Sequence, residues 1–94
     1  MFDAQREGAQ TAVMLAWSNR GDLEMVEGNL ERACEAYASS DAGYAEMGLH
    51  QLRSHALQGL VRARLVRGEL AAAARALVDL ERVVGDATAH EEQR

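Results

Sequence analysis

The sequence predicts an all-α fold, and three observations support this prediction. The 94 residues include no proline and no β-branched run long enough to form a strand. Alanine, leucine, glutamate and arginine dominate, and these residues have the strongest intrinsic preference for helix. Apolar residues recur at spacings of three and four along the chain, which is the period of a helix with one buried face. A chain of this length is expected to form one domain.

Four helices are expected from this periodicity. Their expected bounds, in chain order, are residues 3–27, 29–39, 44–67 and 69–84. Asn29 is the expected N-cap of the second helix, and Asp41, at the end of a short polar joint, that of the third. Gly85 is expected to end the fourth helix, because glycine is the usual residue after a helix terminus. The helical domain would then span residues 1–85, followed by a flexible polar tail over 86–94.

The chain repeats its own pattern after 40 residues. Setting Gly28 against Gly68 aligns "EGNLERACEAY" with "RGELAAAARAL". Both segments have a glycine, a leucine two residues later, an alanine five residues later and a large apolar residue nine residues later. Because glycine adopts the left-handed conformation at little cost, each glycine is expected to form the turn of a helical hairpin.

This pattern resembles the tetratricopeptide repeat, a degenerate helix-turn-helix unit. The matching residues of the first unit are Trp17, Gly21, Gly28, Leu30, Ala33 and Tyr37. Those of the second unit are Leu57, Gly68, Leu70, Ala73 and Leu77. Val61 departs from the family's small residue, the terminal proline is absent, and the period exceeds the usual length of about 34 residues. Such long units are similar to the repeat regions of large bacterial transcription regulators. The resemblance implies two stacked antiparallel hairpins, over about residues 14–41 and 47–84.

Close packing is expected within the first hairpin. Gly21 opposite Ala33 would let the two helices approach, since both side chains are small. Trp17 and Tyr37 would then fill the wider part of the same interface.

A polar strip along the third helix is the candidate binding site. Its members recur at i, i+4, i+7 and i+11, between two apolar stripes. The resemblance implies that three of them line a concave groove, together with two equivalent residues of the first helix. The candidate partner-binding residues are Gln51, His55, Gln58, Arg62, Ser18 and Asp22. Arg62 is suited to a carboxylate, and His55 and Gln58 to a peptide backbone. The alternative is a strip that only contacts solvent.

The residue patterns of common enzymes and metal sites are missing. The sequence has no glycine-rich phosphate loop, metalloprotease spacing or nucleophile elbow. His50 and Glu46 supply two metal ligands without a third. Cys34 lies on an apolar stripe and is expected to be a small buried residue. We therefore expect no enzyme, no cofactor and no metal.

Charge and hydropathy restrict the class of partner and the location. The net charge of −5 argues against general nucleic-acid binding. No apolar run approaches the roughly 18 residues that span a bilayer, and the polar N-terminus does not resemble a signal peptide. We expect a cytoplasmic protein without membrane contact. All ten basic residues are arginine, which indicates a GC-rich bacterial source.

The predicted function is a protein-protein interaction module, an adaptor or scaffold that binds a partner protein or peptide in a helical groove. A homodimer is also expected, most simply two-fold, because the alanine-rich fourth helix suits close packing. One alternative is a self-associating structural or regulatory domain. Another is a helical protein of the type VII secretion class, suggested by "YASSD" from Tyr37 to Asp41.

Overall fold

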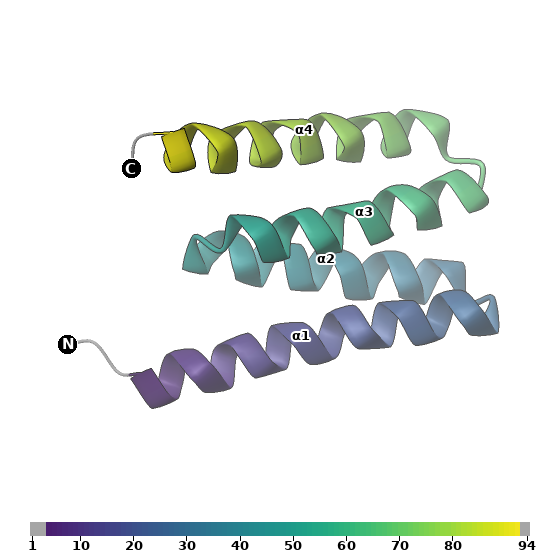
Figure 1. The fold of residues 1–94 in the computed structure, drawn as a ribbon. Helices are drawn as coiled ribbons and strands as arrows, with labels where there is room; N and C mark the ends of the chain where they lie inside the picture. The colour runs from purple at the N-terminus through teal and green to yellow at the C-terminus, as the bar shows by residue number, and fades with distance from the viewer. Residues whose placement is uncertain (1–3, 93–94) are drawn as a thin grey trace.

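Four antiparallel helices form the structure, a computed structural model that describes residues 4–92, with the side chains of residues 6 and 8–86 (Figure 1). Their bounds are α1 Ala4–Glu27, α2 Leu30–Met47, α3 His50–Val66 and α4 Leu70–Glu92. Each helix packs on the one before it, and α3 also touches α1. The all-α hairpin architecture is confirmed. No helix in the described part of the chain is long and apolar enough to cross a membrane.

The three turns share one geometry. Gly28, Gly48 and Gly68 have φ values of 82°, 69° and 80°, in the region that favours glycine. Each glycine N–H donates to the carbonyl three residues back, and the next N–H donates to the carbonyl five residues back, at 2.8–3.2 Å. This pair of bonds is the Schellman motif, which satisfies carbonyls at the end of a helix. The sequence predicted the turns at Gly28 and Gly68, whereas the turn at Gly48 was missed.

The second helix is longer than predicted. The expected joint at residues 39–41 is wrong, because α2 continues through it to Met47. Asp41 is therefore not an N-cap, and α3 begins at His50 instead of residue 44. Asn29 precedes α2, but its side chain makes no capping hydrogen bond.

The first and last helices also continue through glycine. α1 is unbroken through Gly21, which lies against another helix. α4 continues through Gly85 to Glu92, so the prediction that Gly85 ends the helix is wrong. A glycine weakens a helix by about 1 kcal/mol, which is insufficient to end it without a reversed φ. The predicted tail over 86–94 is thus helical to Glu92, and its last two residues lie outside the described part.

Small side chains dominate the core. Its main buried cluster contains Ala33, Cys34, Tyr37, Leu57, Leu60, Ala63, Ala76 and Val83. Alanine at the contacts lets the helices approach closely. The burial of Cys34 confirms the prediction made for this residue.

Candidate partner-binding face

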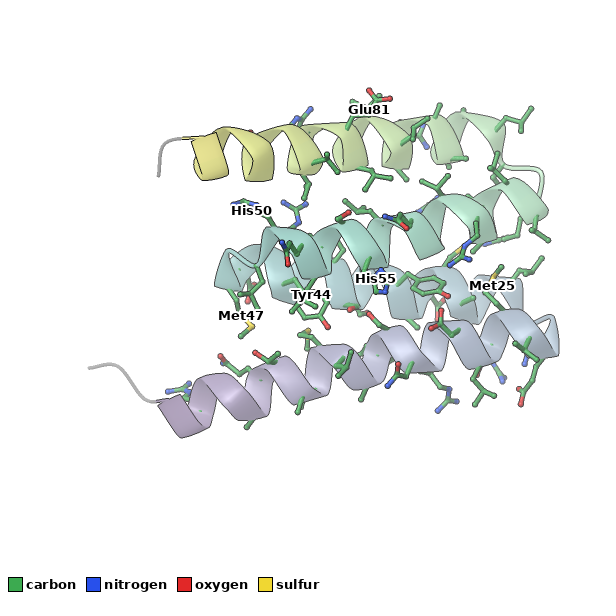
Figure 2. All side chains as sticks on the ribbon, viewed as in Figure 1. Met25, Tyr44, Met47, His50, His55 and Glu81 are labelled. Atoms are coloured by element: carbon green, nitrogen blue, oxygen red, sulfur yellow. The ribbon has the colours of Figure 1, made fainter. Side chains whose placement is uncertain are left out.

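The polar strip of α3 is exposed along its whole length. Gln51, His55, Gln58 and Arg62 are all exposed, while α3 residues on the opposite side are buried. Figure 2 shows His55 on the side of α3 that looks toward α1. The four side chains thus lie on one exposed side of α3. Whether they bind a partner stays a prediction.

Tyr37 of α2 lies between α1 and α3. A Cβ on Gly21 would lie 2.7 Å from Cε1 of the tyrosine ring, and a Cβ on Gly59 would lie closer still. Carbon atoms pack at about 3.5–4.0 Å, so only glycine leaves room for the ring on both sides. The predicted role of Gly21 in close approach is therefore supported. The side chain next to Gly21 is that of Tyr37. The sequence did not predict that Gly59 lies against the same ring.

The hydroxyl of Tyr37 connects this buried ring to the candidate face. It donates a short hydrogen bond to the carboxylate of Asp22 on α1. Burial raises the pKa of Tyr37 far above its ordinary value, and the bond to Asp22 raises it further, while the nearby positive charge of Arg62 lowers it. Asp22 of α1 and Arg62 of α3 thus both act on one hydroxyl. These two predicted site residues therefore both lie near the hydroxyl of Tyr37.

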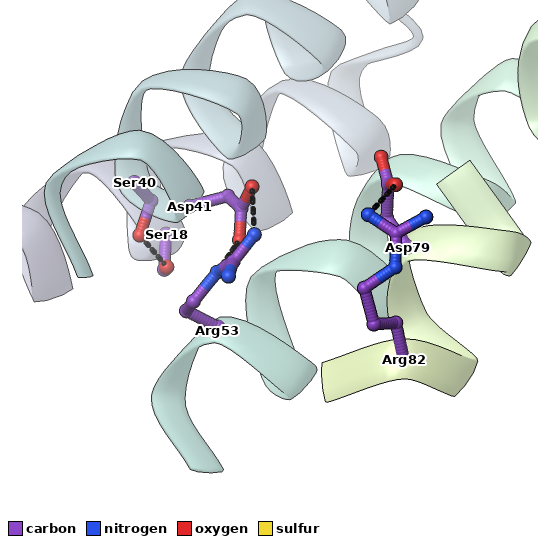
Figure 3. Close-up of polar contacts among 6 residues, drawn as sticks. All are labelled: Ser18, Ser40, Asp41, Arg53, Asp79 and Arg82. Atoms are coloured by element: carbon purple, nitrogen blue, oxygen red, sulfur yellow. Dashed lines mark hydrogen bonds and ion pairs between the residues drawn. The ribbon is translucent and has the colours of Figure 1, made fainter. Parts of the chain in front are cut away.

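Ser18 is drawn into the interface between α1 and α2. Ser40 is fully buried and donates to the carbonyl of Met14 at 2.9 Å. The two serine hydroxyls lie 2.6 Å apart (Figure 3). Since Ser40 has one proton and Met14 accepts it, Ser18 must be the donor to Ser40. The hydroxyl of Ser18 therefore serves the fold, and only part of this side chain is accessible to a partner.

Asp41 joins α2 to α3. Its two carboxylate oxygens accept hydrogen bonds from Nε and Nη2 of Arg53, at 2.9 and 3.4 Å (Figure 3). Bidentate pairs of this kind are among the stronger polar contacts in proteins. The bond to Asp41 raises the pKa of Arg53. Asp41 accordingly fixes the position of α3 on α2 instead of capping a helix.

Trp17 does not fill the interface within the first hairpin, as the sequence led us to expect. Its side chain is 43% exposed. It borders a surface hollow of about 270 Å³ between α1 and α2, which we call the α1–α2 hollow. The residues lining it are Trp17, Arg20, Glu24, Arg32, Glu35 and Ala36.

Glu24 is the buried charge of this hollow. It is 3% exposed, and Arg20 donates to its Oε1 at 2.9 Å, whereas its buried Oε2 accepts no hydrogen bond. The bond from Arg20 holds the pKa of Glu24 below its ordinary value. The i, i+4 spacing of Arg20 and Glu24 could have revealed this pair from the sequence.

Metal-binding clusters are lacking in the part of the chain whose side chains are described. His50 and Glu46 accordingly gain no third ligand there. Comparison with protein-family models, with curated proteins and with solved structures gave no match. The resemblance to the tetratricopeptide repeat therefore remains a prediction.

Proposed function

We propose that this chain is a cytoplasmic, non-catalytic module that binds a partner protein or peptide across the face formed by α1 and α3. The observation that carries the proposal is the strip of four exposed polar side chains on α3 beside Asp22 of α1. The strip can donate and accept hydrogen bonds along about three helical turns. The acidic Asp22 and the basic Arg62 give it charges of both signs.

The fixed position of Asp22 favours a binding role for this face over a strip that only contacts solvent. Asp22 is held by Tyr37, and the ring of Tyr37 is confined between Gly21 and Gly59. A binding group that is already positioned loses less conformational entropy when a partner arrives.

The test compares partner capture by the wild-type chain and by a His55→Ala, Arg62→Glu double variant in cells of the source organism. We expect the double variant to lose proteins that the wild type retains. Arg82→Glu is the matched control, because this exposed arginine lies on α4, away from the strip. Since Arg62→Glu places a carboxylate near Asp22, Gln58→Glu serves as a second variant. Unchanged capture by both strip variants would refute the proposal.

Self-association is the second candidate, as a structural or regulatory domain that forms a homodimer or larger assembly. Exposed apolar side chains of α4 favour it. Leu70, Leu77 and Val78 are 68%, 44% and 53% exposed. Apolar side chains gathered on one surface often mark an interface.

The type VII secretion alternative has less support in the folded chain. Tyr37 is buried and bonded to Asp22, and Asp41 is paired with Arg53. A receptor would need access to both side chains of the motif. Loss of export on Tyr37→Ala, with export on Arg82→Glu unchanged, would support this alternative.

A further inference from the structure

Two surface hollows of this fold are built from equivalent residues. The α1–α2 hollow has a counterpart of the same volume, about 270 Å³, which we call the α3–α4 hollow. Six residues of the α3–α4 hollow each follow one lining residue of the α1–α2 hollow by 40 positions. They are Leu57, Leu60, Arg64, Ala72, Arg75 and Ala76. The 40-residue repeat of the sequence is therefore also a repeat in space.

The two hollows differ in what borders them. Ala38 and Asp41 of α2 also line the α3–α4 hollow, because α2 packs against α3. The α1–α2 hollow is lined by residues of its own hairpin alone. Exposure follows this difference, since Leu57 is 1% exposed and its equivalent Trp17 is 43% exposed. The outer side of the first hairpin thus exposes a surface whose equivalent on the second hairpin is covered by α2.

At the α4 end of the stack, the second hairpin is the one that is exposed. Tyr37 of the first hairpin is covered by α3 and is 2% exposed, while its equivalent Leu77 is 44% exposed. The residues that follow Ala38 and Asp41 by 40 positions are Val78 and Glu81, both exposed. Figure 2 shows Glu81 on the outer side of α4. The groups that would cover an α1–α2 hollow are present at this end.

We propose that copies of this chain associate head to tail, with α1 of one copy docking on the α3–α4 end of another. The contact would repeat the way in which α3 docks on α1 and α2 within one chain. Val78 would lie over the α1–α2 hollow of the next copy, beside its Trp17. Both partners of this contact are exposed in the single chain.

Charge agrees with this pairing. Glu81 lies on the same face of α4 as the exposed apolar and small residues Leu70, Ala74 and Leu77. In the hollow that it would meet, Arg20 is paired with Glu24, whereas Arg32 makes no ion pair within the described structure. Glu81 of one copy would supply a carboxylate for Arg32 of the next.

A head-to-tail contact differs from the two-fold dimer expected from the sequence. The two surfaces are different, so a pair of copies still has one free surface of each kind after the first contact. Such a contact builds chains or rings and does not stop at a pair unless it closes. The mean mass should therefore increase with protein concentration.

The decisive experiment blocks one end at a time. Leu77→Arg blocks the α4 end, and Leu23→Arg blocks the α1 end, where Leu23 precedes the buried Ala63 by 40 positions. Both side chains are about half exposed, so the fold should tolerate the change. We expect each variant alone to sediment as a monomer of 10.2 kDa, and their equimolar mixture to form a dimer of twice that mass. Val26→Arg is the control: this side chain is 86% exposed on another face, and the variant should associate like the wild type.

A second variant tests the register of the contact. Val13 is the residue that precedes Arg53 by 40 positions, and Glu81 follows Asp41 by 40. Val13→Arg should recreate between copies the ion pair that Arg53 and Asp41 form within the chain. We expect tighter association, by about fivefold for a gain of roughly 1 kcal/mol, and loss of this gain when Glu81→Arg is added.

Three results would overturn the proposal. A wild-type chain that stays monomeric at every concentration would exclude the contact. Leu23→Arg that still dimerises alone would indicate a symmetric contact between two α4 helices. A mixture of the two blocked variants that remains monomeric would also exclude the head-to-tail arrangement. Circular dichroism of every variant separates these results from a failure to fold.

Discussion

Gly59→Ala tests the confinement of Tyr37 most directly. The added methyl group would lie well inside contact distance of the tyrosine ring, as would one on Gly21, at 2.7 Å. Ring and helix would have to separate by roughly 1 Å to restore normal carbon contacts. Overpacking of this kind costs about 1–3 kcal/mol. Alanine also stabilises a helix by about 0.5–1 kcal/mol relative to glycine, which offsets part of the loss.

Gly85→Ala is the matched control for this prediction. Gly85 lies inside α4, and an added Cβ there would meet no neighbouring atom within 4 Å. The variant should therefore gain only the stabilisation that alanine gives a helix relative to glycine. The unfolding free energies of the two variants should therefore differ by about 1–3 kcal/mol. For a chain of this size, the melting temperatures should differ by at least about 4 °C.

Thermal and urea unfolding followed by circular dichroism measure this difference. In a Tyr37→Leu background the ring is gone, and Gly59→Ala should then cost less than in the wild type. Equal stabilisation by Gly59→Ala and Gly85→Ala would show that the ring is not confined as described.

Three further predictions concern charged and hydroxyl groups. Because the folded chain raises the pKa of Tyr37, its unfolding free energy should fall as the pH rises above the ordinary value of 10.0, and Tyr37→Phe should reduce this fall in urea titrations at pH 9–11. Because Arg20 lowers the pKa of Glu24, the stability that this carboxylate contributes should be present above its ordinary pKa of 4.5 and be lost as the pH falls through the lower folded value; Glu24→Gln should flatten the dependence. Asp41→Asn should lower the unfolding free energy by about 1 kcal/mol, with a smaller effect in high salt, because it weakens a partly exposed pair with Arg53. A cost that is the same at all salt concentrations would argue against this ion pair.

Local rules predicted the fold class and two of the three turns. Helix preference and apolar period identified most of the helical residues, and the match of Gly28 to Gly68 located two hairpins. The turn at Gly48 was missed because the polar residues at 39–41 resemble the joint between two helices. The buried Ser40 explains the error: its hydroxyl is satisfied by α1, a contact that periodicity cannot reveal.

The site was predictable in part. The exposed strip around His55 and Arg62 followed from helical spacing alone. The roles of Trp17 and Tyr37 could not be assigned in this way, since both are aromatic residues next to small ones. Only the position of α3, and of Gly59 on it, decides that Tyr37 is buried while Trp17 stays outside.

The packing of each helix on its sequence neighbour has a kinetic consequence. Nearly all contacts between helices join segments that one short turn connects. Such contacts close small loops, and proteins that are dominated by them fold quickly. Tyr37 of α2 contacts both α1 and α3, so its packing joins three helices at once. We therefore expect hairpins to form early and independently, and the meeting of Gly21, Tyr37 and Gly59 to be the late step that orders the stack.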